Sequence, residues 1–330
     1  MKTSSIAAAD SYDIVINGGG IVGFSFLAAI KSLPHLSQKR VLLIEQQNEP
    51  KFKNTSPEAE DPFSEKRTFS NRVSSLTAAS KRLFEELDVW HSLEPFAKRV
   101  EGMHVWTDHY QNAVHFEDSS GGGGQEATCY IVENNRMIRS LVERIRADQA
   151  EVAYSTSVQE IEQVKKEVDD DSSFRNEATS ILLRLSPTSS FERSSSSVLQ
   201  TKLLIGCDGF KSLVRSRSTL PYYAAELAQM GIVGTLQLES PFTDNSVAFQ
   251  RFLADQLVIA LLPLSPRHAS FVLSVQAKDL DGWMSLADED FVHRLNSEIS
   301  REVRTGPVDR FAAELSKVSV GSDFFSCEIN

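Results

Sequence analysis

The chain has 330 residues, 41% hydrophobic and 24% charged, which predicts one large or two joined folded domains and excludes the composition of a disordered protein. Its 45 acidic and 34 basic residues give a net charge of −11 without a long basic block, so nucleic acid is not expected as a partner. The three cysteines are scattered and lack the paired spacing of a zinc site or a disulfide framework, so we expect no metal site.

The first elements along the chain predict a βαβ unit. Residues 13–17 (DIVIN) form a short apolar run that leads into glycines, and residues 21–33 predict a helix that ends before Pro34. Residues 40–45 (RVLLIE) predict a second buried strand. This order of elements indicates a parallel, Rossmann-like sheet.

Three glycines occupy the turn between the first predicted strand and helix. Gly18, Gly20 and Gly23 match the pattern G-x-G-x-x-G. Gly18 would permit a tight turn, Gly20 would let a pyrophosphate approach the backbone, and Gly23 would allow the helix to pack closely on the strand. Glu45 ends the next strand and would accept hydrogen bonds from ribose hydroxyl groups. The context predicts a dinucleotide site rather than a plain glycine-rich turn, but the pattern does not separate FAD from NAD.

The middle of the chain contains further periodic segments. Residues 77–90 and 134–146 predict helices, and residues 152–161 and 199–206 predict strands. Low-complexity and charged stretches interrupt them, so segments 119–124 and 165–197 are expected to be surface insertions.

The last third of the chain predicts a different architecture. Three β-rich runs separated by turn residues indicate an antiparallel sheet, at residues 247–253, 257–264 and 269–276. An amphipathic helix is expected after them, at residues 288–303. No closing element is recognisable in the last dozen residues. The sequence therefore predicts an α/β protein with a nucleotide-binding domain at residues 10–215 and an antiparallel β-sheet substrate domain at residues 216–330.

A second strand that ends in G-x-D-G, at Asp208 and Gly209, lies far downstream of the first glycine motif. This arrangement resembles the flavin-dependent aromatic hydroxylases of the para-hydroxybenzoate hydroxylase type, in which the Asp-Gly turn contacts FAD. A simple turn after a strand is the alternative interpretation. The stretches SNRVSSL, YIVEN and QTKLLIG, at residues 70–76, 130–134 and 200–206, resemble signatures of the ubiquinone-pathway hydroxylases, above all their mitochondrial branch.

The resemblance covers roughly residues 12 to 300 and implies a cofactor site for FAD. By position, Gly18, Gly20, Gly23 and Glu45 correspond to the residues that bind the ADP part of FAD. The resemblance also implies that Asp208 and Gly209 contact FAD and that Arg72 and Asn134 contact the flavin. A surface salt bridge for Arg72 and a helix cap for Asn134 are the alternatives. No catalytic side chain and no metal ligand is assigned.

The resemblance implies a monooxygenase that hydroxylates the ring of a polyprenylated phenolic ubiquinone precursor at C5. It would use molecular oxygen and electrons from NAD(P)H or ferredoxin, within a ubiquinone-biosynthesis complex. No apolar run reaches the roughly 20 residues that span a bilayer, so we expect peripheral contact with the matrix side of the mitochondrial inner membrane. Residues 1–12 contain one lysine and no arginine, and they show no clear transit peptide.

One feature of the family is not found in the sequence. The resembling hydroxylases have a C-terminal Gly-Asp motif, with His and Pro and a glycine-rich helix start, that binds the flavin, whereas this chain ends at Asn330 without it and is expected to be truncated. Two alternative hypotheses follow: a non-catalytic member of the ubiquinone-biosynthesis complex, and an FAD hydroxylase of a soluble phenolic acid.

Overall fold

The computed structural model describes residues 10–52, 61, 64, 67–107, 113–117, 127–165, 179–187, 198–239, 241, 246–253, 256–301 and 326–329. The chain divides into two compact units, each considered by itself below. Unit 1 comprises Met1–Asn54, Leu87–Val89 and Met137–Tyr223, and unit 2 comprises Thr55–Glu86, Trp90–Arg136 and Ala224–Asn330.

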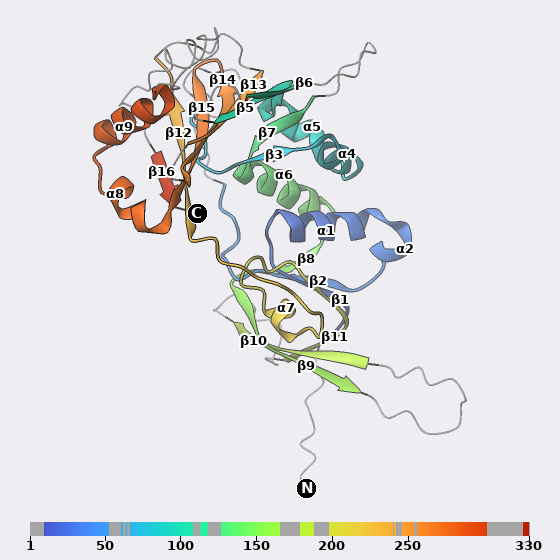
Figure 1. Cartoon of the computed structure of the whole chain (residues 1–330). Coiled ribbons are helices and arrows are strands. Elements are labelled where there is room, and N and C mark those ends of the chain that lie inside the picture. Colours follow the sequence, from blue (N-terminus) through green and yellow to red (C-terminus); the bar gives the residue numbers. More distant parts are fainter. Residues whose placement is uncertain are drawn as a thin grey trace, which may run out of the picture. The chain divides into compact units, whose positions relative to one another are not determined.

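Unit 1 is built on a six-stranded sheet (Figure 1). Its order is β8 (Glu151–Ala153), β2 (Val41–Ile44), β1 (Asp10–Asn17), β11 (Val198–Gly206), β10 (Thr179–Pro187) and β9 (Thr156–Lys165). The first four strands run parallel, and β10 and β9 pair antiparallel. Helix α1 (Ile21–Ser32) packs against β1 and β2, and all four residues of β2 are buried, as in a strand covered on both faces. The short helices α2 (Pro34–Ser37) and α7 (Leu213–Arg217) complete the described part of this unit together with most of α6 (Asn134–Ala147).

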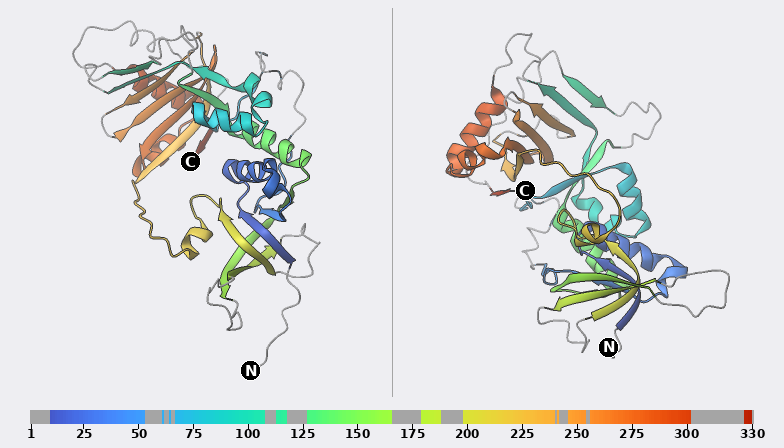
Figure 2. Two further views of the ribbon diagram at one scale, coloured as in Figure 1. Left: turned by 90° about the vertical axis from the view of Figure 1, so that its right-hand side faces the viewer. Right: turned by 60° about the horizontal axis from the view of Figure 1, so that its bottom comes forward.

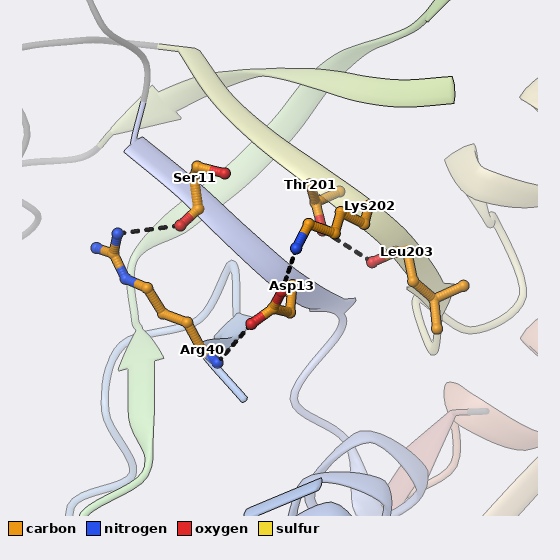
Figure 3. Close-up of polar contacts among 6 residues, drawn as sticks. All are labelled: Ser11, Asp13, Arg40, Thr201, Lys202 and Leu203. Carbon is orange, nitrogen blue, oxygen red and sulfur yellow. Dashed lines mark hydrogen bonds and ion pairs between the residues drawn. The ribbon is translucent and has the colours of Figure 1, made fainter. Parts of the chain in front are cut away.

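Polar contacts tie the beginning of β1 to its neighbours (Figure 3). The carboxylate of Asp13 accepts a hydrogen bond of 2.7 Å from Nζ of Lys202 on β11 and one of 3.1 Å from the backbone N–H of Arg40, just before β2. The Arg40 guanidinium in turn donates to the carbonyl of Ser11 at 3.0 Å. These contacts hold the register of the parallel strands, and the Lys202 and Arg40 bonds lower the pKa of Asp13.

Unit 2 contains a seven-stranded mixed sheet and a three-stranded sheet, both visible in Figure 2. The larger sheet has the order β16 (Ser326–Ile329), β12 (Gln229–Gln237), β15 (His268–Gln276), β14 (Val258–Ser265), β13 (Val247–Phe252), β5 (Gly102–Thr107) and β6 (Val114–Glu117). The smaller sheet has the order β3 (Val73–Leu76), β7 (Cys129–Glu133) and β4 (Lys98–Val100). The unit also contains helices α4 (Ala78–Glu86), α5 (Trp90–Leu93), α8 (Leu280–Met284) and α9 (Asp288–Ser300), with short 3₁₀ turns at Glu94–Phe96 and Ala277–Asp279.

The core of unit 2 lies between its large sheet and the helices α8 and α9. Phe291 is buried there in ring contact with both Phe271 and Trp283, which are buried as well. Arg251 of β13 is also buried, and its guanidinium donates hydrogen bonds to the carbonyl oxygens of Glu298, Ile299 and Arg301 at the end of α9. Because the last carbonyls of a helix have no partner within it, Arg251 satisfies them and fixes the helix to the sheet.

The structure confirms the predicted βαβ unit and the antiparallel pairing of the three C-terminal β-rich runs. The compact units divide the chain differently from the predicted domains, because residues 55–86 and 90–136 belong to the same unit as the C-terminal part of the chain. The structure corrects the predicted insertion at residues 165–197, since Thr179–Pro187 within it forms β10, paired with strands on both sides. The other predicted insertion, 119–124, lies outside the described residues.

Two element boundaries differ for local reasons, and one further element was not predicted. The predicted strand 152–161 is divided into β8 and β9 because Ser155 has a positive φ of 52°. The predicted helix 77–90 ends at Glu86, since Asp88 has a φ of 57° that a right-handed helix cannot include. The last dozen residues do contain an element, β16, which pairs antiparallel with β12. None of the described helices is long and apolar enough to cross a bilayer.

Candidate functional site

The glycine turn after β1 needs glycine at two of its positions. Gly18 has a φ of 108°, and a Cβ atom there would lie 2.3 Å from the carbonyl oxygen of Cys207. A Cβ atom at Gly23, in the first turn of α1, would lie 1.9 Å from the carbonyl oxygen of Gly18. Both distances are far below van der Waals contact, so a side chain at either position would push the strand, the turn and the helix apart.

Gly20 differs from the other two glycines of the motif. It has an ordinary φ of −76°, and a Cβ atom there would meet nothing within 4 Å. Gly20 is also the N-cap residue of α1, so it offers no side chain to the first N–H groups of the helix, and the first turn holds no acidic residue. The fold therefore does not require glycine at Gly20, whereas a ligand that approaches the backbone would.

The end of β2 places Glu45 beside this turn. Its carboxylate accepts hydrogen bonds from the backbone N–H groups of Gly19 at 2.5 Å and of Gln47 at 2.6 Å. A carboxylate has about four lone-pair positions, so two of them are left to accept bonds from a ligand. These two backbone bonds fix the direction of the carboxylate toward the turn.

The turn after β11 is organised by Asp208. Its carboxylate accepts hydrogen bonds from the side-chain amide of Asn17 at 3.2 Å and from the backbone N–H groups of Leu213 and Val214 at 2.7 and 3.2 Å. The next residue, Gly209, has a positive φ of 73°, and a Cβ atom there would meet nothing within 4 Å. Asp208 thus joins the ends of β1 and β11 to the start of α7.

These two turns and the end of β2 line one cavity of about 380 Å³ in unit 1. The sequence-predicted residues that line it are Gly18, Gly20, Glu45, Asp208 and Gly209, together with Thr156, Cys207 and Lys211. Gly23 is not among the lining residues, because it serves the packing of α1. Burial, and then the charge of Asp208, raise the pKa of the Cys207 thiol, so this side chain is neutral.

The residues fit a dinucleotide in this cavity. The open face of Gly20 and the N–H groups at the start of α1 suit a pyrophosphate, and Glu45 suits a ribose. The volume lies within the usual range for ligand sites in proteins, about 300–1,000 Å³. Among the described residues, no group of His, Cys, Asp and Glu side chains could hold a metal ion.

The two other predicted site residues, Arg72 and Asn134, belong to unit 2. Arg72 directly precedes β3 and Asn134 directly follows β7, and these strands are paired. The backbone N–H of Asn134 donates to the carbonyl of Arg72 at 3.0 Å, and its side-chain oxygen accepts from the Ser74 hydroxyl at 2.7 Å. The structure therefore brings Arg72 and Asn134 together within unit 2.

A buried ion pair beside this group is not evident from the sequence. The guanidinium of Arg67 lies 2.5 Å from the carboxylate of Glu133, and both side chains are at most 6% exposed. Glu133 also accepts a hydrogen bond of 2.6 Å from the backbone N–H of Ser70, while the Arg67 guanidinium lies over the rings of Phe69 and Phe96. Glu133 immediately precedes Asn134 in the stretch YIVEN, and this neighbouring position is the sequence feature that could have indicated a role for Glu133.

Known proteins are similar to this chain in sequence and in fold. The chain is 34% identical to the protein named ubiquinone biosynthesis monooxygenase COQ6, mitochondrial, of Xenopus tropicalis over 87% of its own length, and 33% identical to that of Mus musculus over 88%. It spans 56% of the length of each of these relatives. In fold it is similar to PqsL, a probable FAD-dependent monooxygenase from Pseudomonas aeruginosa, with a TM-score of 0.64 at 18% identity, over 97% of this chain and 73% of that one.

The similarity in fold to a flavin-dependent protein confirms the predicted fold class. A family model described as FAD binding domain matches residues 64–322, a range that begins after the glycine turn and includes Arg72, Asn134 and Asp208. The chain belongs to this family of FAD binding domains, and its cofactor is FAD.

Proposed function

We propose that the chain provides the FAD-binding part of a monooxygenase that hydroxylates, at C5, the ring of a polyprenylated ubiquinone precursor. The observation that carries the proposal is the open face of Gly20 at the start of α1, within a cavity that also contains Glu45 and Asp208. It occurs in a chain similar to proteins named as ubiquinone biosynthesis monooxygenases, which supports this substrate class.

The residues have separate roles in this proposal. The N–H groups at the start of α1 and the backbone at Gly20 bind the pyrophosphate, and Glu45 accepts hydrogen bonds from a ribose. Gly18 and Gly23 keep the turn and the helix in place, whereas Asp208 and Gly209 line the cavity at the turn after β11. Arg72 and Asn134 contact the flavin, and the hydrogen bond from the backbone N–H of Asn134 to the carbonyl of Arg72 holds them in a fixed relation to each other.

The cofactor carries the redox chemistry. When bound, FAD supplies the electron transfer and oxygen activation by which one atom of molecular oxygen enters the phenolic ring, with NAD(P)H or ferredoxin as the source of electrons. The chain itself binds and orients the cofactor and keeps water away from it, so no catalytic triad or metal is assigned. We extend the proposal to a ubiquinone-biosynthesis complex at the matrix side of the mitochondrial inner membrane, where a polyprenyl substrate is held by its tail.

The first test is the cofactor content of the purified chain. Its flavin absorbance and FAD stoichiometry are measured first, followed by oxygen-dependent conversion of a polyprenylated hydroxybenzoate with NAD(P)H or with reduced ferredoxin. We expect FAD in a nearly equimolar ratio and a product with one added hydroxyl group at C5. A hydroxybenzoate without a tail serves as the matched substrate.

Three outcomes would contradict parts of the proposal. A folded chain that binds no FAD would contradict the role of the cavity. Equal conversion of the tailless substrate would contradict the polyprenylated substrate class and favour a hydroxylase of soluble phenolic acids. FAD binding without turnover, with every donor and substrate supplied, would contradict the proposed catalytic activity. It would favour the alternative that the chain is a non-catalytic, flavin-binding member of the ubiquinone-biosynthesis complex.

A further inference from the structure

A second cavity, of about 310 Å³, lies within unit 2. Residues at the end of β15, in the short helix α8 and in α9 line it, and these elements are neighbours in Figure 1. None of the described residues that line it belongs to the cofactor site that the sequence predicts. Its volume is at the lower end of the usual range for ligand sites, about 300–1,000 Å³, so the cavity suits a small molecule.

Arg294 of α9 lines this cavity and is held in place by α8. The carbon of its guanidinium lies 3.9 Å from the centre of the Trp283 ring, and one of its N–H groups donates a hydrogen bond of 3.0 Å to the carbonyl of Gly282. Trp283 is 2% exposed and belongs to the core of unit 2, so its ring is a rigid support. A guanidinium has five N–H donors, and the Gly282 carbonyl is its hydrogen-bond acceptor among the described residues. Arg294 therefore keeps a planar set of unused donors in a fixed position.

Positive charge exceeds negative charge in the lining of the cavity. Three cations, Lys278, Arg294 and Arg301, line it together with two carboxylates, those of Asp279 and Glu298, although the chain as a whole has a net charge of −11. Glu298 is already engaged, since its carboxylate accepts a hydrogen bond of 3.1 Å from Arg301. Lys278 is exposed and has no hydrogen-bond or ion-pair partner among the residues that the structure describes. The cavity thus offers two cationic groups, those of Lys278 and Arg294, to an anion.

We infer that this cavity binds a small organic molecule through a phosphate or carboxylate group. The planar donors of Arg294 match two oxygens of such a group, and Lys278 adds a point charge. A purely structural role for Arg294, joining α9 to α8, would need only the Trp283 and Gly282 contacts, and it would give Lys278 no function. The site belongs to unit 2 alone and goes beyond the proposed hydroxylation, because a chain without that activity would still contain it.

Isothermal titration calorimetry with matched probes tests the site. Glucose 6-phosphate, gluconate and glucose share most of their structure and carry a phosphate, a carboxylate and no charge, respectively. Inorganic phosphate and acetate represent the bare groups. Excess FAD is present throughout, so that the pyrophosphate site of unit 1 does not take up the probes. We expect the two organic anions to bind once per chain, more weakly at high salt, and glucose not to bind. Whichever organic anion binds more tightly identifies the group.

Variants with a matched control locate the binding. Arg294→Gln should weaken binding of the tighter probe by about tenfold or more, since it removes charged hydrogen bonds. Arg294→Lys keeps the charge without the planar donors and should also bind more weakly than the original chain. Arg267→Gln is the control and should bind normally, because Arg267 is another exposed arginine of unit 2 that donates to a backbone carbonyl, that of Glu239, but does not line the cavity.

Lys278→Gln provides a test that leaves the Trp283 contact intact. It should weaken binding of the same probe by about fivefold, and circular dichroism shows whether each variant is folded. The inference is overturned if none of the four anions binds, if glucose binds as tightly as the organic anions, or if Arg267→Gln loses as much affinity as Arg294→Gln. Bare phosphate or acetate that binds as tightly as the organic anions would overturn the assignment to an organic molecule. Loss of anion binding in Arg294→Gln and Lys278→Gln, with unchanged flavin content, supports the site.

Discussion

The side-chain amide of Asn17 donates a hydrogen bond of 3.2 Å to the carboxylate of Asp208, although 191 positions separate the two residues. Asn17 ends β1 and Asp208 follows β11, so this bond joins the two turns that line the cavity. The backbone N–H of Cys207 donates to the carbonyl of Asn17 at 2.7 Å and reinforces the same junction. The two glycine-containing motifs of the sequence are therefore parts of one structure.

Replacing Asp208 should affect both stability and the cofactor. Asp208→Asn removes the charged acceptor of the Leu213 and Val214 N–H groups, and we expect the free energy of unfolding to fall by about 2 kcal/mol. FAD affinity should fall as well, because the wall of the cavity loosens. Urea unfolding and fluorescence titration with FAD measure the two effects. Asp279→Asn, at an exposed aspartate of unit 2, is the control; an equal loss there would contradict a specific role for Asp208.

Replacing two glycines of the same turn by alanine should change stability by very different amounts. Gly18→Ala introduces a Cβ atom at a positive φ and against the Cys207 carbonyl, so the free energy of unfolding should fall by about 3 kcal/mol or more. Gly20→Ala meets open space and should change it by less than about 0.5 kcal/mol.

FAD affinity then separates folding from binding at this turn. If Gly20 faces the pyrophosphate, Gly20→Ala should weaken FAD binding by about tenfold or more, equal to about 1.4 kcal/mol, in a chain of normal stability. Equilibrium titration of flavin fluorescence measures this. A Gly20→Ala chain with normal FAD affinity would show that the cofactor does not approach the backbone at this residue.

The buried pair Arg67 and Glu133 should show strong coupling. Glu133→Gln leaves the buried Arg67 guanidinium without its anion, and Arg136, which lies 4.0 Å from the same carboxylate, loses that anion too. We therefore expect a loss of about 3 kcal/mol in the free energy of unfolding. Arg67→Met together with Glu133→Gln should lose less than the sum of the two single changes.

A surface pair provides the control for that cycle. Arg184 and Glu160 form an ion pair whose side chains are both more than half exposed, so Glu160→Gln should cost less than about 1 kcal/mol. Chemical denaturation of all variants gives the coupling energies. Equal effects in the buried and the exposed pair would contradict the importance of burial at Glu133.

Stability should depend on pH through His268. Burial, followed by the positive charges of Arg67 and Arg267, lowers the pKa of this imidazole, whose Nδ1 lies 2.9 Å from the Ser265 hydroxyl. The unfolded chain therefore binds a proton at a higher pH than the folded chain does. Below the ordinary histidine pKa of about 6.5, the free energy of unfolding should decrease until the pH reaches the lowered pKa of the folded state.

Urea unfolding above and below the ordinary histidine pKa, for the original chain and for His268→Gln, measures the contribution of His268 to the free energy of unfolding. The variant should lose part of the pH dependence in this window. The stabilisation from Asp13 persists in both chains, because it is lost only when the pH falls toward the lowered pKa that Asp13 has in the folded state. Identical pH profiles for the two chains would contradict a neutral, half-buried His268.

Local patterns predicted the elements that depend on neighbouring residues. The glycine turn, helix α1 and the strands β1, β2 and β11 follow from short apolar runs and from glycine spacing, and the structure has them within a few residues of the predicted bounds. Contacts between distant segments were not predictable in this way. Strand β10 lies in a region of charged and low-complexity sequence, yet it pairs with β9 and β11 because its alternating residues Leu183 and Leu185 are buried in the core of unit 1.

The sequence by itself determined the βαβ unit and the glycine turn, because both depend on apolar periodicity and on positions where a Cβ atom cannot fit. Only the tertiary structure decided that Asp208 is bonded to Asn17, that Glu133 pairs with Arg67, and that Gly20, unlike Gly18, is open to a ligand. The residue type determines which hydrogen bonds and ion pairs a side chain can form. Which bond it does make depends on the partners that the fold brings within about 3 Å, and that distance is set by packing over the whole unit.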